Sequence, residues 1–160
     1  MKIIILIGYP GSGKSTWAKS LPGNNRIVSS DSYFTDADGN YNWTIQEAHK
    51  GHEDCLRRFV ETIIARARGL MSKPIAEWYI DNLIVDNTNV RIFDSAPYIR
   101  IAQAYGLDVE VKYIDTDISV AKSRNVHKVP DVAYESMKRN FEFLLQNWPK
   151  DFPDIEYVKI

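Results

Sequence analysis

The residues best suited to do chemistry form the segment GYPGSGKST, residues 8–16, which follows the apolar run KIIILI. Its spacing is G-x-x-x-x-G-K-[ST], the pattern of a loop that binds nucleotide phosphates. Glycines allow several backbone N–H groups to point at one place, while the lysine and the start of the following helix add positive charge. The pattern therefore predicts a phosphate site, named here the phosphate loop.

Side-chain chemistry suggests individual roles within the phosphate loop. Lys14 brings a full positive charge to the phosphates, and the hydroxyl of Ser15 is an oxygen ligand for Mg²⁺. Because the chain has no Asn-Lys-x-Asp pattern that reads guanine, we expect ATP as the nucleotide. The loop residues expected to bind ATP are Gly8, Pro10, Gly11, Ser12, Gly13, Lys14, Ser15 and Thr16.

Two aspartates follow predicted strands. Asp31 comes just after RIVSS, and Asp86 ends LIVD. In an open parallel sheet, ligands bind beyond the carboxyl ends of the strands, so both carboxylates should lie near the phosphate loop. Asp31 could accept the proton of an acceptor hydroxyl, or it could cap a helix. Asp86 is expected in the Mg²⁺ site with Ser15, and turn chemistry at the strand end is the alternative.

The basic segment AKSRNVHKVP carries Arg124, His127 and Lys128 between two predicted helices. It could fold over ATP as a lid and neutralise the charge of the transferring phosphoryl group, or it could be a solvated loop. A base and a basic lid are what a kinase needs, whereas a switch or motor needs a water-positioning residue. We therefore predict a kinase with Lys14, Asp31, Arg124 and Lys128 as catalytic residues, and Arg124 also in contact with ATP.

Strand and helix patterns alternate along the chain. Apolar, largely β-branched strands are expected at residues 2–7, 26–30, 83–86, 109–114 and 155–160. A capping box of Thr44 and Glu47 predicts a helix that runs to Gly69, and Asp94 or Ser95 should cap another. Further helices are expected at residues 14–21, 118–125 and from 131 onward. The alternation predicts an α/β fold of the P-loop NTPase type: a mostly parallel sheet of about five strands, with helices on both faces and a helical, basic lid.

Composition limits the function classes. The 160 residues suit one domain, here residues 1–160, with 44% hydrophobic residues, 26% charged residues and a net charge of −1. Without a global basic field, a nucleic acid would have to bind a local patch. The one cysteine fits a reducing compartment, and the apolar N-terminal run is too short for a signal peptide or a membrane span. We expect a cytoplasmic protein without a membrane partner or an evident obligate protein partner.

Four motifs, taken in order, resemble a known family: IIILIGYPGSGKSTWA, the Asp31 segment, VDNTN and RNVHKVP. They are similar to the kinase domain of phage polynucleotide 5′-kinases. SSDSYFTDADGNYNW, EAH and RNVHKVP resemble still more closely the related nucleic-acid kinase domain of an animal ubiquitin-ligase-binding protein. The resemblance extends from Lys2 to about Glu142 and implies transfer of the ATP γ-phosphate to a hydroxyl of DNA or RNA, with Mg²⁺.

The resemblance also implies roles for single residues. It places Lys14 and Ser15 at phosphate and metal, Asp31 as the general base, and Arg124 and Lys128 in the lid. Two positions depart from the phage pattern. The phage kinases have an arginine that contacts substrate phosphate where this chain has Phe34, and an aspartate where it has Asn87. The donor side is therefore retained, while the acceptor side has changed.

Other acceptors stay open at this point. Small phage kinases of similar type phosphorylate 5-hydroxymethyluracil in DNA, and an unpaired base needs aromatic neighbours. Aromatic residues do follow Asp31, although they could equally form a locally packed loop: Tyr33, Phe34, Tyr41 and Trp43. The near-neutral charge would suit a nucleoside or small-metabolite kinase. A further alternative is an ATP-binding switch module that transfers no phosphate.

Overall fold

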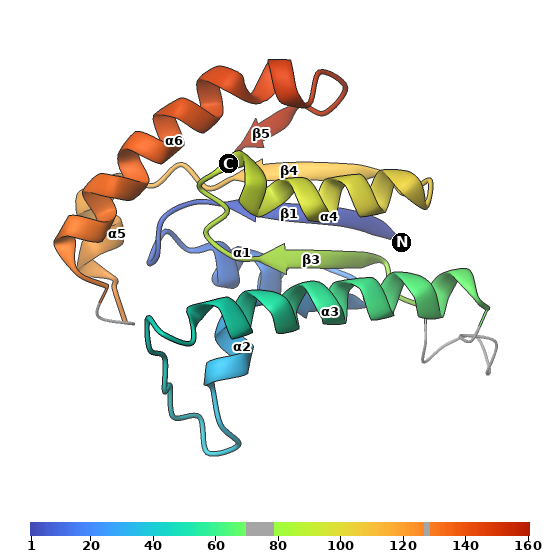
Figure 1. Ribbon diagram of the computed structural model, residues 1–160, viewed down its shortest axis with the longest axis horizontal. Coiled ribbons are helices and arrows are strands. Elements are labelled where there is room, and N and C mark those ends of the chain that lie inside the picture. The colour runs from blue at the N-terminus through green and yellow to red at the C-terminus, as the bar shows by residue number, and fades with distance from the viewer. Residues whose placement is uncertain (70–78, 127–128) are drawn as a thin grey trace.

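All strands of the sheet run in the same direction. The computed structural model describes residues 1–69, 79–126 and 129–160. These residues form a five-stranded sheet in the order β2-β3-β1-β4-β5, and every neighbouring pair is parallel (Figure 1). The strands are β1 Lys2–Ile7, β2 Asn25–Val28, β3 Asn82–Asp86, β4 Val109–Tyr113 and β5 Tyr157–Lys159. The predicted α/β class with a parallel sheet of about five strands is confirmed.

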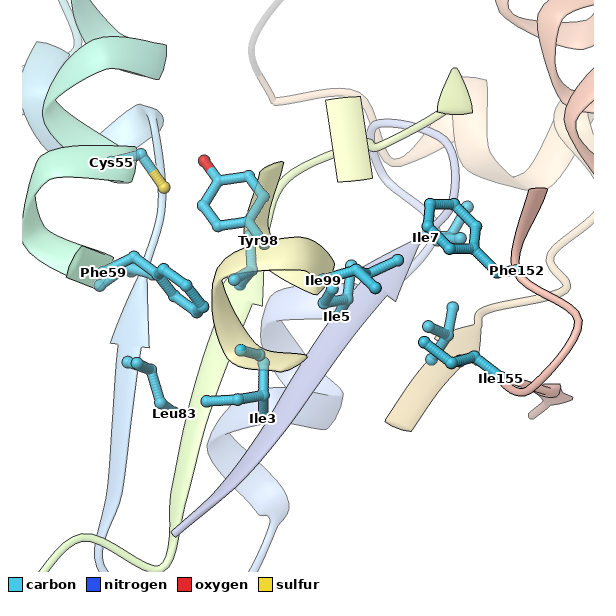
Figure 2. Close-up of a cluster of buried hydrophobic side chains, with 14 of the residues drawn as sticks. Ile3, Ile5, Ile7, Cys55, Phe59, Leu83, Tyr98, Ile99, Phe152 and Ile155 are labelled. Atoms are coloured by element: carbon cyan, nitrogen blue, oxygen red, sulfur yellow. The ribbon is translucent and has the colours of Figure 1, made fainter. Parts of the chain in front are cut away.

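Helices cover both faces of this sheet. They are α1 Lys14–Ser20, α2 Asp31–Phe34, α3 Ala48–Ala67, α4 Ile92–Ala104, α5 Ile118–Ser123 and α6 Asp131–Asp151. Alternation along β1 explains the layers, because successive side chains of a strand point to opposite faces. Ile3, Ile5 and Ile7 enter the large core with side chains of α3 and α4 and of the segment that follows α6 (Figure 2). Ile4 and Leu6 pack on the other face with Ala18 of α1.

The position of β1 determines where a ligand can bind. β1 pairs with β3 on one side and with β4 on the other, so the chain crosses from one half of the sheet to the other beside β1. Parallel α/β sheets bind ligands at such a switch point, beyond the carboxyl ends of the strands. The phosphate loop leaves β1 at that edge and leads directly into α1.

Two helix starts differ from the sequence prediction. Thr44 and Glu47 form a turn, with the Glu47 N–H donating to the Thr44 carbonyl at 3.2 Å, and α3 begins only at Ala48. α4 begins at Ile92, so Asp94 lies inside its first turn, where its carboxylate accepts a hydrogen bond from the Arg91 N–H at 3.1 Å. Both predictions located the start of a helix, but the N-cap residues are Glu47 for α3 and Arg91 for α4.

Among the helices of the described residues, none combines the length and the apolarity that crossing a membrane requires.

Candidate active site

Backbone conformation shapes the phosphate loop. Gly13 precedes α1 with a φ of 102°, a left-handed value that other residues rarely adopt. A Cβ atom at Gly13 would meet nothing within 4 Å, so the space in front of the helix start is open. The buried hydroxyl of Ser12 has no hydrogen-bond partner among the described residues. An open position at a helix start and an unused polar group both fit a bound phosphate.

Neighbouring elements hold the loop in place. Gly11 has a φ of 76°, and a Cβ there would lie 2.2 Å from the carbonyl oxygen of Ala121 in α5, so only glycine fits. The Thr116 hydroxyl donates to the Ser12 carbonyl at 2.8 Å, and the Tyr134 hydroxyl donates to the Pro10 carbonyl at 3.1 Å. The loop is therefore fixed through its own backbone by α5, by α6 and by the segment after β4.

Lys14 lies beneath this loop and is 8% exposed. Its ammonium group donates to the carbonyl oxygens of Gly8 at 3.1 Å and Tyr9 at 2.7 Å. Burial lowers the pKa of Lys14 to about 8, although the carboxylates of Asp86 and Asp31 act in the opposite direction. A buried cation without a directly bonded carboxylate among the described residues fits an incoming anionic phosphate.

Ser15 and Asp86 are the residues predicted to bind the metal. Asp86 is buried at the end of β3, and its carboxylate lies close enough to Ser15 for that side chain to lower its pKa. Burial raises the pKa of Asp86, while the Ser15 side chain and the Lys14 charge oppose that rise. Mg²⁺ prefers oxygen ligands and keeps several waters, so a hydroxyl paired with a carboxylate fits this ion. Thr16, the last predicted residue of the loop, is exposed beside Ser15.

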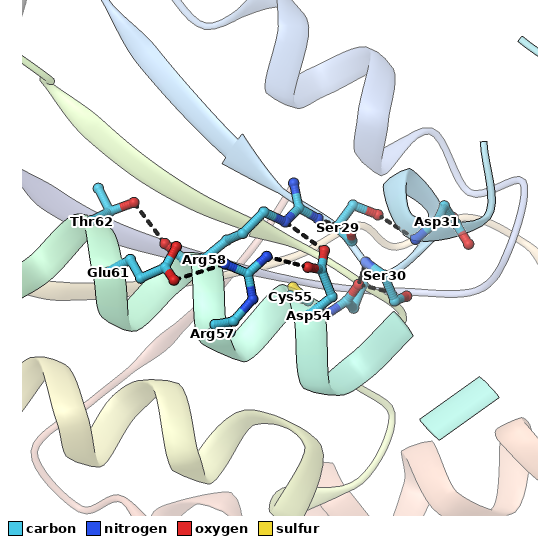
Figure 3. Close-up of polar contacts among 10 residues, drawn as sticks. Ser29, Ser30, Asp31, Asp54, Cys55, Arg57, Arg58, Glu61 and Thr62 are labelled. Atoms are coloured by element: carbon cyan, nitrogen blue, oxygen red, sulfur yellow. Dashed lines mark hydrogen bonds and ion pairs between the residues drawn. The ribbon is translucent and has the colours of Figure 1, made fainter. Parts of the chain in front are cut away.

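Asp31 begins α2, three residues beyond the end of β2, and two other elements hold the segment before it (Figure 3). The amide oxygen of Asn87, after β3, accepts hydrogen bonds from the Ser30 N–H at 2.9 Å and from the Ser30 hydroxyl at 3.0 Å. Arg58 of α3 donates to the Ser29 carbonyl at 2.6 Å and pairs with Asp54 at 2.8 Å. The backbone around Asp31 is therefore fixed from β3 and from α3.

Asp31 also acts at a distance on the donor side of the site. Its negative charge contributes to the pKa values of both Lys14 and Asp86, so the three groups share one electrostatic environment. The structure thus brings the predicted base, the predicted phosphate lysine and the predicted metal carboxylate together at one edge of the sheet. A base, a phosphate-binding cation and a metal carboxylate are the kinds of group that phosphoryl transfer to a hydroxyl uses.

Phe34 occupies the position where the phage kinases have arginine. Its side chain is buried, so it cannot contact a substrate as that arginine does. The ring is 5% exposed and packs over Gly51 of α3, where an added Cβ would lie 2.5 Å from the Phe34 ring. Tyr33 and Trp43, by contrast, are 45% and 46% exposed. The aromatic segment after Asp31 is therefore divided: one residue packs locally, as the loop alternative supposed, and two face solvent.

Of the two residues predicted to act in the lid, Arg124 and Lys128, the structure describes Arg124. Arg124 ends α5 with an exposed side chain, and its carbonyl carbon lies 3.3 Å from the position of a Cβ on Gly11. The backbone of Arg124 is thus next to the phosphate loop. Lys128 and His127 lie outside the described residues.

A groove of about 450 Å³ opens beside the phosphate loop. It is lined by His52 of α3, by the segment after β3 and by the first half of α6. Thr88 belongs to this lining, and its carbonyl oxygen accepts the Gly8 N–H at 3.0 Å. Through Thr88, the groove therefore reaches the point where β1 enters the phosphate loop.

Sequence reasoning missed two contributors to this site. Arg58 has the appearance of a solvent-facing residue of α3, since its ion pair with Asp54 follows ordinary helical spacing. Its bond to Ser29 joins residues 29 positions apart, and no local pattern signals it. Tyr41 was noted only as one of several aromatic residues, but its hydroxyl donates to the Asp31 carboxylate at 2.9 Å.

A family model described as an AAA domain matches residues 3–144, which is most of the chain. The chain belongs to this family, and with its parallel sheet and phosphate loop it is a P-loop kinase domain.

Individual relatives point to a branch of that family. The chain is 27% identical over 147 residues to NEDD4-binding protein 2 of Homo sapiens, covering 88% of this chain and 8% of the human protein. It is 24% identical over 165 residues to the bifunctional polynucleotide phosphatase/kinase of Schizosaccharomyces pombe, covering 98% of this chain and 33% of that protein. The chain thus spans a third or less of the length of these relatives.

A solved structure supports the fold independently. The Pnkp1/Rnl/Hen1 RNA repair complex contains a chain that matches with a TM-score of 0.64 and 20% identity, over 91% of this chain and 45% of that one. The predicted resemblance to polynucleotide kinase-like domains is confirmed at the level of family and fold.

Proposed function

We propose that this chain is an ATP- and Mg²⁺-dependent kinase that phosphorylates a hydroxyl group of a nucleic acid, as 5′-hydroxyl polynucleotide kinases do. The observation that carries the proposal is geometric: the phosphate loop after β1, Asp86 at the end of the neighbouring β3, and Asp31 just after β2 lie at the same edge of the parallel sheet. The similarity to a polynucleotide phosphatase/kinase supports a nucleic-acid acceptor.

The donor side would hold ATP and its metal. The backbone N–H groups of the phosphate loop and the Lys14 ammonium would bind the phosphates, with Ser15 and Asp86 at Mg²⁺. Mg²⁺, when bound, neutralises part of the phosphate charge. Lys14 would exchange its two backbone carbonyl partners for phosphate oxygens, which offer a full negative charge.

On the acceptor side, Asp31 would act as general base. Its carboxylate takes the proton of the acceptor hydroxyl, and the hydroxyl oxygen forms a bond to the γ-phosphorus of ATP. The bond from that phosphorus to its bridging oxygen breaks at the same time, and ADP leaves. Arg124, beside Gly11, and Lys128 would neutralise charge on the phosphoryl oxygens, completing the lid role proposed for this segment.

An assay with ATP labelled at the γ-phosphate tests the proposal. The acceptors are 5′-hydroxyl DNA, 5′-hydroxyl RNA, duplex DNA containing 5-hydroxymethyluracil, and free nucleosides. We expect label at 5′ ends. Label on free nucleosides alone would refute a nucleic-acid acceptor, and ATP binding without any transfer would identify a switch module.

Lys14→Ala should abolish labelling of every acceptor, and an active Lys14→Ala enzyme would contradict the donor site.

A base hydroxyl is the second candidate acceptor, and the exposure of Tyr33 and Trp43 favours it. Both rings lie on the segment that follows Asp31, where an unpaired base could stack on them. Label within the 5-hydroxymethyluracil duplex, rather than at its ends, would select this acceptor. Trp43→Ala should then reduce labelling of the duplex more strongly than labelling of 5′ ends.

A further inference from the structure

The chain after Asp31 folds back on itself within ten residues. Thr35 and Tyr41 pair as an antiparallel bridge, and the Asn42 N–H donates to the Phe34 carbonyl at 2.8 Å. The turn between them is closed by Asp36, whose carboxylate accepts the backbone N–H groups of residues 38 and 40 at 3.0 and 2.8 Å. This hairpin, residues 35–41, brings its last residue back to the start of α2.

Tyr41 is the residue that returns. Its hydroxyl donates to Oδ1 of Asp31 at 2.9 Å. The Tyr41 ring stands edge-on to the ring of Phe34, with centroids 6.3 Å apart, and Phe34 is itself fixed against α3. Side-chain packing and backbone pairing therefore both determine where the Tyr41 hydroxyl lies.

The Tyr41 hydroxyl is a permanent donor. Burial raises the pKa of Tyr41, and the charge and hydrogen bond of Asp31 raise it further. Tyr41 consequently keeps its proton throughout the working range of an enzyme. It differs in this respect from a group that could itself exchange protons with a substrate.

A base needs a fixed orientation as well as a suitable pKa. An aspartate carboxylate rotates easily about its last bond, and a general base acts only when its oxygen is aligned with the proton that it removes. A hydrogen bond from a rigid donor restricts this rotation, and small misplacements of a reacting group are costly in rate.

We propose that Tyr41 is a positioning residue of the reaction: its hydroxyl holds the Asp31 carboxylate in the orientation that accepts the proton of the acceptor hydroxyl. This inference rests on the proposed function, because it assigns Tyr41 no role without Asp31 as base. Tyr41 takes no proton itself and forms no bond to substrate.

The first test is Tyr41→Phe, which removes the hydroxyl and keeps the ring. We expect kcat to fall about tenfold, the value of one hydrogen bond to a charged group, with the KM values of ATP and acceptor unchanged. Tyr113→Phe is the matched control, because burial and the neighbouring Asp115 raise the pKa of Tyr113 as burial and Asp31 raise that of Tyr41, and Tyr113 lies on β4, three places from β2 in the sheet. Its kcat should equal that of the wild type.

A double-mutant cycle separates positioning from general stability. If Tyr41 acts through Asp31, Tyr41→Phe should have no further effect on the residual rate of Asp31→Glu, in which the longer side chain displaces the carboxylate. An additive loss would overturn the proposal. So would an unchanged or raised kcat in Tyr41→Phe, or a change confined to KM. Retained ATP affinity in each variant, measured by calorimetry, shows that the fold is intact, and loss of that affinity would reduce Tyr41 to a structural residue.

The outcomes also distinguish this inference from the proposed function. If the Asp31→Asn enzyme were active, both the general-base role of Asp31 and the positioning role of Tyr41 would be refuted. An inactive Asp31→Asn enzyme beside a fully active Tyr41→Phe enzyme would leave the base in place and refute only the role of Tyr41.

Discussion

The donor side and the acceptor side of this site are built by different means. The donor side, the phosphate loop, is fixed through its backbone: its carbonyl oxygens accept bonds from Lys14, Thr116 and Tyr134, and Gly11 fits against α5 without room for a side chain. The acceptor side, residues 29–43, is held through its backbone at Ser29 and Ser30 and also through its own side chains, in the Ser30–Asn87 and Tyr41–Asp31 hydrogen bonds. The close fit at Gly11 restricts which residue the donor side can hold. Side-chain hydrogen bonds can be exchanged by substitution, so the acceptor side can change its residues more easily.

The largest expected effect is a loss of phosphate transfer after a substitution on the acceptor side alone. Asp31→Asn should lower phosphate transfer by about 1,000-fold, because general-base catalysis is lost, while ATP binds as before. Steady-state rates and calorimetric ATP titration measure the two quantities. Asp38→Asn removes an exposed carboxylate from the same segment and should leave both unchanged. If Asp31→Asn lost ATP affinity as well, the two sides could not be treated as separable.

This contrast also explains what the sequence could predict. The place of the phosphate loop between β1 and α1 was predictable, since its pattern is contained in nine consecutive positions. Asp31 and Asp86 were predictable because parallel strands bring their carboxyl ends to one edge. Arg58 and the role of Asn87 were not, because their bonds to Ser29 and Ser30 cross 29 and 57 positions of the chain.

Local patterns also misled where the tertiary structure decided the outcome. Thr44 and Glu47 have the spacing of a capping box, but the chain makes a separate turn there before α3 begins. A four-residue pattern contains no information about the packing of Phe34 over Gly51, which joins α2 to α3 a few residues away. The elements were therefore more predictable than their first residues.

The next effect tests the steric fit of the donor side. Gly11→Ala should destabilise the protein by about 3 kcal/mol, through strain at positive φ and overlap with the Ala121 carbonyl. Gly106→Ala is the control, since Gly106 has a φ of 63° but nothing within 4 Å of an added Cβ. It should cost only about 1 kcal/mol. Urea denaturation measures both, and equal losses would mean that contact with α5 does not constrain the loop.

A smaller effect tests the hydrogen bonds of the acceptor side. Asn87→Ala should lower kcat about tenfold, because the Ser30 backbone and hydroxyl lose their shared partner. Ser30→Ala removes only the hydroxyl bond and keeps the N–H bond, so its loss should be smaller. ATP affinity should not change in either variant. A larger loss in Ser30→Ala than in Asn87→Ala would contradict the anchoring role of Asn87.

The smallest effect concerns the charge of the donor side. With the Lys14 pKa lowered to about 8, the ammonium group loses its proton as pH rises through that value. Metal-free ATP binding should therefore weaken by about fourfold between pH 7 and pH 8.5. Calorimetric titrations at constant ionic strength provide the measurement. An affinity independent of pH over this interval would show that Lys14 stays charged or does not contact the phosphates.

The two carbonyl bonds of Lys14 have a consequence for ligand discrimination. Without a nucleotide, the ammonium group is already satisfied by Gly8 and Tyr9, so a ligand must compete with internal partners rather than with bulk water. A neutral or singly charged molecule offers little more than two carbonyl dipoles. A polyphosphate offers several negative charges at once and can outcompete them. A ligand must therefore bind the Lys14 ammonium group more strongly than the two carbonyl oxygens do, and singly charged anions in the cell do not meet this condition.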